Sequence, residues 1–337
     1  MILVWVKFLV CVALVLFFGT KLSRYGDIIA EKTGLSGIWI GLLLLAIVTS
    51  LPEIITGISA ITVVRAPDLA MGTLFGSNAF NLSIIALLDI ICRHGPLFAT
   101  ASQAHKLSAG LGILLIAFAG ASIILSTRVW GGGVYGLSIY SLVLVLLYLF
   151  GSRYIFRRER NSPSVEAAAL RYRNISARRA YLGFAIAAMA IIGTGTWLAL
   201  VGDDIAAVTG LGSTFVGSLF LALTTSLPEL VVALAALRIG AVDMAIADVL
   251  GSNMFNMGIG VAIYDLSYGR ASIFAVLSQS HIVTAIVVVL MSLIVIVGLI
   301  SRTRRKTPLA MSWYSIVLLG VYITGVYFLF TMSRPAG

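Results

Sequence analysis

Two copies of one pattern run through the sequence. Residues 49–53 read Thr-Ser-Leu-Pro-Glu, and residues 225–229 repeat them without change. Residues 76–81 read Gly-Ser-Asn-Ala-Phe-Asn and recur at 251–256 with one difference, Met254 for Ala79. The offset is 176 residues at the first motif and 175 at the second, so one residue is missing from a connection. Such self-similarity predicts two related structural units.

The composition places both units in a membrane. The chain has 337 residues, of which 60% are hydrophobic and only 11% are charged, whereas a soluble domain has roughly a quarter of its residues charged. Apolar runs of about 20 residues, the length of a spanning helix, recur along the whole chain. The expected spans are ten: Ile2–Phe18, Gly37–Val64, Leu69–Ile90, Leu107–Ser126, Gly133–Gly151, Ala180–Val201, Ser213–Leu237, Val242–Tyr264, Ile282–Ile300 and Ser312–Phe330.

Five spans fall in each copy of the pattern. Because five is odd, the two copies enter the membrane from opposite sides, which is the inverted-repeat construction of many secondary transporters. The predicted fold is therefore an all-α integral membrane protein with ten transmembrane helices in two inverted five-helix repeats. We expect the first repeat at residues 1–152, a basic cytoplasmic linker at 153–179, and the second repeat at 180–337.

The distribution of Lys and Arg among the loops indicates the membrane topology. Of the 23 Lys and Arg residues, 18 fall in one set of alternating loops and four in the other, with Lys7 inside the first span. This asymmetry predicts that both termini lie outside, and it makes nucleic acid an unnecessary explanation of the net charge of +10. The short chain, the lack of regulatory insertions and the basic cytoplasmic loops fit a multi-pass protein of a prokaryotic inner membrane. The Arg153–Arg179 loop could contact anionic lipid. Cys11 and Cys92 are expected to be free thiols, without a disulfide or a metal site.

Glu53 and Glu229 lie near the middle of apolar spans. A carboxylate at that depth costs several kcal/mol, roughly, unless it meets a cation or water. No basic residue lies at the centre of a span to pair with them, so a mobile cation is the natural partner. A pair of neutral, hydrogen-bonded structural glutamates is the alternative, and the repetition of the whole motif disfavours it.

Oxygen atoms surround the two glutamates in the predicted arrangement. Pro52 and Pro228 interrupt their helices and free the carbonyls of Val48 and Thr224. Ser77 and Asn81 are four residues apart and share one helix face, as do Ser252 and Asn256. Oxygen ligands suit Ca²⁺, Na⁺ and Mg²⁺ rather than zinc or copper. The neighbouring hydroxyl groups of the repeated motif belong to Thr49, Ser50, Thr225 and Ser226.

The two motif pairs resemble the α-repeats of the cation/calcium exchanger superfamily, particularly its sodium/calcium exchanger branch. The resemblance implies ten helices in two inverted halves, central binding of Ca²⁺ and Na⁺ as transported ions without a cofactor, and sliding of spans one and six to give alternating access. It implies that Glu53 and Glu229 share the bound ion and that Thr49, Ser50, Thr225 and Ser226 add oxygens. The resemblance further implies flanking Na⁺ sites, which are completed by Ser77, Ser252 and the carbonyls of Ala46 and Ala222.

Two positions depart from the family pattern. Asn256 stands where some members have aspartate, and Asp248 stands where the family often has asparagine, as a helix-mouth residue or a coupling proton site. The Gly-Asn-Ala motif of the proton-coupled branch is missing, which favours Na⁺ as the driving ion.

The leading hypothesis is a Na⁺/Ca²⁺ antiporter. H⁺-coupled exchange of Ca²⁺ or another cation is the alternative. The sequence contains no nucleophile motif and no metalloprotease motif of the kind that an intramembrane hydrolase would need. No enzyme activity is therefore expected. An open channel fits inverted repeats with broken helices less well than a carrier does.

Overall fold

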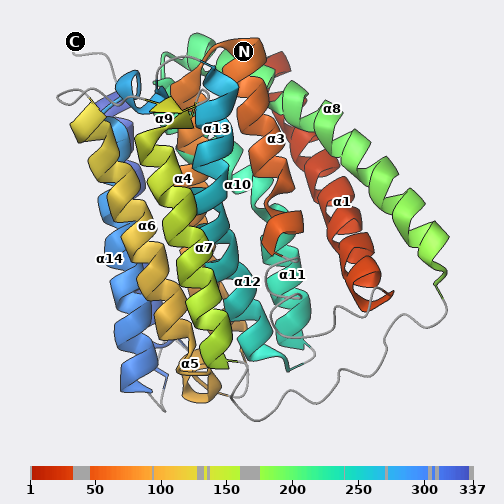
Figure 1. Ribbon diagram of the computed structural model, residues 1–337, viewed down its shortest axis with the longest axis vertical. Coiled ribbons are helices and arrows are strands. Elements are labelled where there is room, and N and C mark those ends of the chain that lie inside the picture. Colours follow the sequence, from red (N-terminus) through yellow and green to blue (C-terminus); the bar gives the residue numbers. More distant parts are fainter. Residues whose placement is uncertain are drawn as a thin grey trace.

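A computed structural model describes the chain as a bundle of long helices (Figure 1). The described residues are 2–32, 46–92, 95–126, 133–134, 137–159, 175–238, 240–269, 272–302, 306–307 and 311–333. Within them, nine helices are long and apolar enough to cross a membrane, or ten when the bent pair Ser213–Thr225 and Leu227–Arg238 counts as one span. The number of spans expected from hydropathy is therefore reproduced.

The first half contributes its helices in chain order. They are α1 (Ile2–Lys32), α3 (Leu51–Ser59), which continues as the π-helical segment η1 (Ala60–Val64), α4 (Pro67–Ile91), the short α5 (Leu97–Thr100), α6 (His105–Ser126) and α7 (Ile139–Glu159). Two differences from expectation appear. Helix α1 continues well past Phe18, and the fifth span begins at Ile139 because Gly133–Val134 (β1) and Leu137–Ser138 (β2) pair as a short antiparallel ribbon.

The second half follows the same order. Its elements are α8 (Ala177–Thr209), α9 (Ser213–Val216), η2 (Gly217–Leu221), α10 (Ala222–Thr225), α11 (Leu227–Arg238), α12 (Val242–Phe255), η3 (Asn256–Gly260), α13 (Val261–Tyr268), η4 (Ile273–Ala275), α14 (Ser280–Ser301) and α15 (Trp313–Ser333). The last two turns of α7 include Arg153, Arg157 and Arg158, so the beginning of the expected linker is helical. Residues 160–174 of that linker lie outside the described part of the chain.

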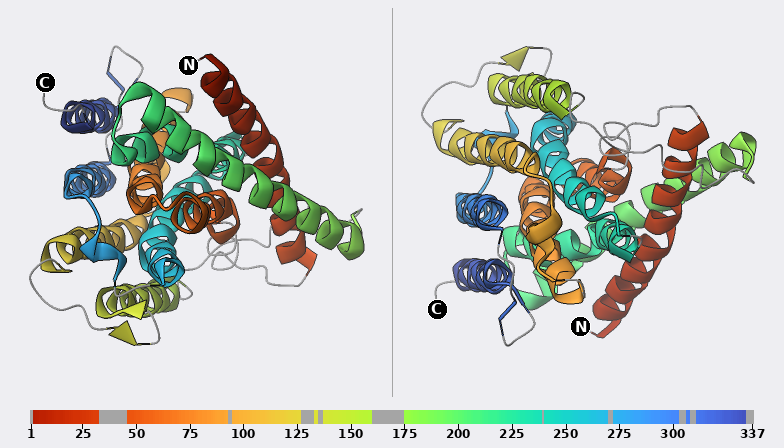
Figure 2. Two further views of the ribbon diagram at one scale, coloured as in Figure 1. Left: turned by 90° about the horizontal axis from the view of Figure 1, so that it is seen from above. Right: turned by 90° about the horizontal axis from the view of Figure 1, so that it is seen from below.

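The two halves have opposite orientations. In Figure 1, α1 descends from the N-terminus at the upper end, whereas α8 rises from the lower right, and both chain ends lie at the upper end. Helices α1 and α8 cross each other on one side of the bundle, as both views in Figure 2 show. The Lys7 ammonium lies 3.5 Å from an Asp204 carboxylate oxygen and so links these two outer helices.

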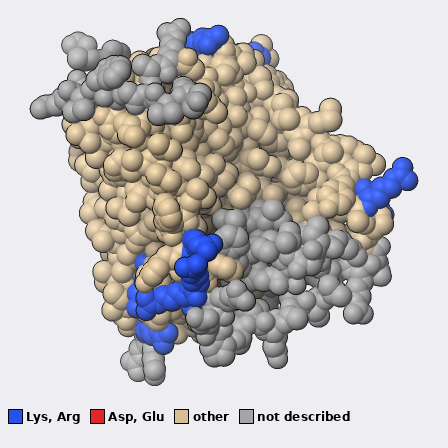
Figure 3. Space-filling view, in the orientation of Figure 1, with Lys and Arg blue, Asp and Glu red and all other residues tan. Residues whose placement is uncertain are grey.

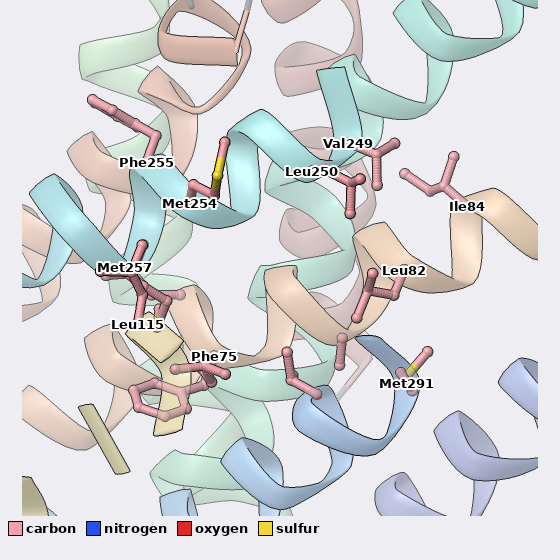
Figure 4. Packing of buried hydrophobic residues seen from close by; sticks show 14 of the residues in the cluster. Phe75, Leu82, Ile84, Leu115, Val249, Leu250, Met254, Phe255, Met257 and Met291 are labelled. Carbon is pink, nitrogen blue, oxygen red and sulfur yellow. The ribbon is translucent and has the colours of Figure 1, made fainter. Parts of the chain in front are cut away.

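Helices α4 and α12–α13 form the centre of the bundle. Figure 4 shows Val249 and Leu250 of α12 packed toward Leu82 and Ile84 of α4, and these four side chains are at most 2% exposed. Gly76 allows the backbone of η2 to approach α4, because an added Cβ would lie 2.3 Å from the Ser218 carbonyl oxygen. The absence of a side chain at Gly76 thus lets the segment before the second helix break pack closely against α4.

Two buried aspartates near the ends of α4 and α13 hold connecting segments in place. The Asp89 carboxylate accepts hydrogen bonds from the backbone N–H groups of Leu97 and Ser312, both at 2.8 Å. Asp265 likewise accepts from the N–H groups of Ile273, at 2.8 Å, and Ser138, at 2.7 Å. From sequence, such end residues are expected to be solvated, but both are 0% exposed. The expectation was wrong because their partners come from distant backbone.

A second pair of polar contacts is also duplicated. His281 lies 3.0 Å from Asp68, which also accepts from the Ser278 N–H at 2.7 Å. His105 lies 2.9 Å from Asp243, which accepts from the Ser102 N–H at 2.6 Å. In each pair the aspartate comes from one half and the histidine from the other. The halves are therefore cross-linked near both ends of the bundle.

Basic side chains are unevenly placed on the described surface. On the face shown in Figure 3, a cluster of blue atoms lies toward the lower end, a smaller one lies at the right edge and small ones lie at the upper end, and the rest of the described surface there is largely uncharged. The lower end is the one where α7 finishes with Arg157 and Arg158 and where α11 finishes with Arg238. We call this the basic end of the bundle. It lies opposite both chain termini.

Candidate functional site

The two repeated Thr-Ser-Leu-Pro-Glu motifs interrupt their helices at equivalent points. In the first half, Ser50 has φ −81° and ψ 0° and α3 starts after it, with Pro52 in its first turn. In the second half, Ser226 separates α10 from α11, and the segment Ser213–Thr225 is bent by 42° from Leu227–Arg238. A proline lacks the N–H of a continuous helix, which accounts for a break at this place in both copies.

The glutamates after each break reach across to the other half. Ser226 Oγ donates to Glu53 Oε1 at 2.7 Å, and Ser50 Oγ donates to Glu229 Oε1 at 3.3 Å. Ser77 Oγ donates a further bond to Glu53 Oε1 at 3.3 Å. Both glutamates are 0% exposed. Each acid is therefore buried at the interface of the halves and held through one of its two oxygens.

The central helices α4 and α12 provide a polar wall beside the glutamates. Asn78 Nδ2 donates to the Asn253 carbonyl at 3.3 Å, and Asn253 Nδ2 donates to the Asn78 carbonyl at 3.0 Å. Asn81 and Asn256 donate to the side-chain oxygens of Asn253 and Asn78, at 3.0 and 3.2 Å. The four amides thus exchange bonds in a two-fold pattern.

Hydroxyl groups and carbonyls of the breaks lie in the same region. Thr49 Oγ1 lies 3.4 Å from Ser252 Oγ and also donates to the Ala46 carbonyl at 3.2 Å. Thr225 Oγ1 donates to the Ala222 carbonyl at 3.3 Å, which Ser77 Oγ also reaches at 3.5 Å. Printed contacts aside from these, the picture is consistent: hydrogen bonds connect ten of the twelve predicted residues to a partner within the set. The other two, Asn81 and Asn256, bond to the repeated asparagines instead.

Several buried oxygens at the centre have no hydrogen-bond partner. They are Oε2 of Glu53 and of Glu229 and Oδ1 of Asn81 and of Asn256. A buried carboxylate oxygen without a partner is costly in apolar surroundings. Carboxylate and amide oxygens are ligands that hard cations prefer, so this arrangement is suited to binding such an ion. No group of three or more acidic, histidine or cysteine side chains converges among the described residues, so neutral oxygens would supply most of the ligands.

Three residues of the site are missing from the sequence-based set. Asn78 and Asn253 stand within the repeated motif, so their repetition was the available signal. Tyr264 donates its hydroxyl to the Glu53 carbonyl at 2.6 Å, and it fits there because Gly57 has no side chain: an added Cβ would lie 1.7 Å from the Tyr264 oxygen. Asp265 and Asp89 make equivalent contacts and are 176 positions apart, so Tyr264 corresponds to Leu88 in the first half. The first half therefore has no equivalent tyrosine, and nothing in the sequence pattern marks Tyr264.

Two inverted halves, broken helices and a buried polar centre between them define a secondary transporter. The family model for the sodium/calcium exchanger protein matches residues 3–152 and 179–331. The chain therefore belongs to the sodium/calcium exchanger family, whose members are membrane exchangers rather than enzymes and whose transported ions are Ca²⁺ and Na⁺.

Individual relatives agree with this assignment. The chain is 28% identical over 259 residues to the inner membrane protein YrbG of Escherichia coli, covering 76% of this chain and 78% of that protein. It is 31% identical over 129 residues to the sodium/calcium exchanger MaX1 of Methanosarcina acetivorans, covering 37% of this chain and 33% of that one. A solved structure of the sodium-calcium exchanger NCX_Mj matches with a TM-score of 0.61 at 22% identity, over 97% of this chain and 99% of that chain.

These similarities support a specific conclusion. The likeness to NCX_Mj shows the same transporter fold, and the family assignment makes the chain a multi-pass membrane exchanger of cations in the calcium exchanger class. Its bacterial and archaeal relatives suggest the plasma membrane of a prokaryote. The prediction that both termini lie outside rests on the charge asymmetry alone.

Proposed function

We propose that the chain exchanges Na⁺ for Ca²⁺ across the membrane at the central site. The observation that carries the proposal is that Glu53 and Glu229 are both fully buried, face each other's half, and keep one oxygen each without a partner. The proposed ligands are these two carboxylates with oxygens of Thr49, Ser50, Thr225, Ser226, Ser77, Ser252, Asn81, Asn256, Ala46 and Ala222.

Charge explains why the two ions would compete. Two ionised carboxylates are balanced by one Ca²⁺ or by two Na⁺, and a buried pair without a cation is unfavourable. Each carboxylate accepts a serine hydroxyl from the break of the other half, so an ion bound by both acids would offset their desolvation and their mutual repulsion. A site that is stable only when filled would cross the membrane loaded in both directions, which is the requirement for exchange rather than leak.

Helices α1 and α8 are proposed to move relative to this site. Gly19 of α1 faces Pro228 of the second break, where an added Cβ would lie 2.4 Å from the proline side chain. Gly195 of α8, the equivalent residue, faces Thr56 of α3, with an added Cβ 3.0 Å from its Oγ1. Smooth contacts of this kind allow a helix to slide along its neighbour and open the site to one side at a time. In this proposal residues 1–152 and 180–337 are the two repeats and residues 153–179 join them.

The test is ⁴⁵Ca²⁺ uptake into proteoliposomes loaded with Na⁺ or with choline. We expect uptake that requires internal Na⁺ and disappears in Glu53→Gln. Asp203→Asn is the matched control, since this acid also lies on α8 and its side chain is exposed. Uptake by Glu53→Gln equal to that of Asp203→Asn would reject the site.

Proton-coupled exchange is the alternative outcome of the same experiment. The same glutamates would then carry H⁺ in place of Na⁺. Ca²⁺ uptake that does not depend on internal Na⁺ but is driven by an imposed pH gradient would show H⁺ coupling and contradict the proposal of Na⁺ coupling. Absence of Ca²⁺ uptake under both gradients would remove the calcium proposal.

A further inference from the structure

Asp248 of α12 is a buried acid outside the set of proposed ligands. Its side chain is 1% exposed, and both of its carboxylate oxygens lack a hydrogen-bond partner. The equivalent residue of the first half, 175 positions earlier, is Thr73. The Thr73 hydroxyl donates to the Leu69 carbonyl at 3.0 Å. The two halves therefore differ here, a neutral satisfied side chain in one and an unpartnered carboxylate in the other.

The structural aspartates of this protein show what Asp248 lacks. Asp89 and Asp265 are equally buried, but backbone N–H groups donate to both oxygens of each. Within the described residues, the only other buried carboxylate oxygens without a partner are Oε2 of Glu53 and Oε2 of Glu229. Asp248 thus resembles the acids of the cation site rather than the acids that hold the fold together.

Asp248 lies on the side of the central site that faces the basic end. Ser252, which approaches Thr49 at the site, is four residues further along α12 and so shares its helix face. Helix α12 starts at Val242, beside the basic end, so Asp248 is about 9 Å and Ser252 about 15 Å along its axis. A bilayer core is about 30 Å thick, which puts Ser252 near mid-depth and Asp248 between the site and the basic end.

Asp248 is close to the central site without being part of one cluster. Ser252, one turn further along the same face of α12, lies 3.4 Å from Thr49 of the first break. Yet no three acidic side chains converge on one point among the described residues. Asp248 is therefore not grouped with the two glutamates around one point in this structure. An ion held by Asp248 would occupy a separate position one helical turn away.

We propose that Asp248 forms a separate subsite for a hard, oxygen-preferring cation on the path between the central site and the basic end. The subsite rests on the proposed exchange function and adds an asymmetry to it. A cation that approaches the basic end meets repulsion from arginine side chains, and a buried carboxylate beyond them offsets this repulsion. Thr73 offers no charge at the matching depth on the opposite side. Asp248 therefore raises the apparent affinity for cations from the basic end only.

Sided transport measurements test this asymmetry. Inside-out and right-side-out vesicles present opposite ends to the medium, and a cysteine placed at Arg238 and labelled with an impermeant maleimide identifies the basic end. We expect Asp248→Asn to raise the KM for ⁴⁵Ca²⁺ from the basic end about tenfold and the KM from the other end less than about twofold. Asp248→Thr, which copies the first half, should behave in the same way, and Thr73→Val should change neither value. Equal changes at both ends, or none, would overturn the inference.

A binding experiment separates this inference from the proposed transport function. In purified Glu53→Gln/Glu229→Gln protein the central acids are gone, and we expect residual low-affinity ⁴⁵Ca²⁺ binding that Asp248→Asn removes. Equal binding with and without Asp248 would overturn the subsite, whatever the wild-type protein transports. Loss of Na⁺-driven flux in the wild type, with Asp248-dependent binding retained, would instead reject only the exchange function. Size-exclusion chromatography in detergent verifies that each variant is folded.

Discussion

The buried carboxylates at the centre of the bundle differ from those near its ends. Asp89 and Asp265 each tie two backbone N–H groups from separate segments. Glu53 and Glu229 accept only serine hydroxyls on one oxygen and leave the other without a partner. All four are 0% exposed, so burial alone does not distinguish them. The number of carboxylate oxygens that accept a hydrogen bond distinguishes them. Acids with both oxygens bonded stabilise the fold, and acids with one oxygen free can bind an ion.

The largest expected effect comes from neutralising a central acid. Glu53→Gln or Glu229→Gln should abolish Ca²⁺ binding, a loss of about 100-fold or more, because half of the site's charge is removed. Without ions, the same variants should melt at the wild-type temperature or above, since repulsion between two buried acids is relieved. Calcium titration and thermal melting in detergent measure both quantities. A clearly lower melting temperature of these variants without ions would mean that the glutamates stabilise the fold as Asp89 does, and would contradict the comparison.

The opposite pattern is expected at the ends. Asp89→Ala leaves two buried N–H groups without acceptors, which costs about 2 kcal/mol or more. We expect a lower melting temperature with Ca²⁺ affinity per folded molecule unchanged, and the same outcome for Asp265→Ala at the opposite end. Equilibrium ⁴⁵Ca²⁺ binding to the folded fraction checks this prediction. A selective loss of affinity would mean that the end acids take part in the ion path.

A smaller effect sharpens the comparison within the centre. Ser226→Ala removes the 2.7 Å bond to Glu53, and a hydrogen bond to a charged group contributes about 1.5–3 kcal/mol. We expect Ca²⁺ affinity to fall about tenfold. Ser50→Ala should have a weaker effect, because its bond to Glu229 is longer at 3.3 Å. Titration of the two variants side by side gives the order, and the reverse order would show that hydrogen-bond length does not set the contribution.

The smallest effect is expected at the histidines. His281→Ala removes one of two bonds to Asp68 and leaves the Ser278 N–H bond in place, so a loss of about 1 kcal/mol in stability is expected. His281→Gln keeps a donor of similar reach and should recover part of it. Melting curves of both variants and of His105→Ala make the comparison. An unchanged melting temperature for His281→Ala would mean that the bond contributes nothing net.

Much of this architecture could be predicted from the amino-acid sequence. Hydropathy marked all ten spans, and the repeated motifs pointed to Glu53, Glu229 and the serines that donate hydrogen bonds to them. Helix ends were less predictable. Hydropathy measures where apolar runs stop, whereas α1 and α8 continue through polar residues to Lys32 and Thr209. Gly133 seemed to begin a span because the short ribbon before Ile139 is also apolar.

The remaining features depended on partners far away in the chain. Asp89 and Asp265 were expected in solvent because nothing near them in the sequence reveals a buried N–H group from another segment. Tyr264 reaches Glu53 across 211 positions and only because Gly57 leaves room. Local patterns cannot report such long-range contacts. The repeated asparagines were within reach, since Asn78 and Asn253 occupy matching places in the two copies.

The exchange of bonds between Asn78 and Asn253 has a consequence for the origin of the molecule. Each amide is satisfied only by the other half, so a five-helix half made alone would have to find a second copy inserted upside down. An ancestral single-repeat protein with such a sequence could have worked as an antiparallel pair of identical subunits. Fusion of two copies would then have fixed their relative orientation and freed one copy to change, as Thr73 and Asp248 now differ. Two separately expressed halves should still assemble into one exchanger.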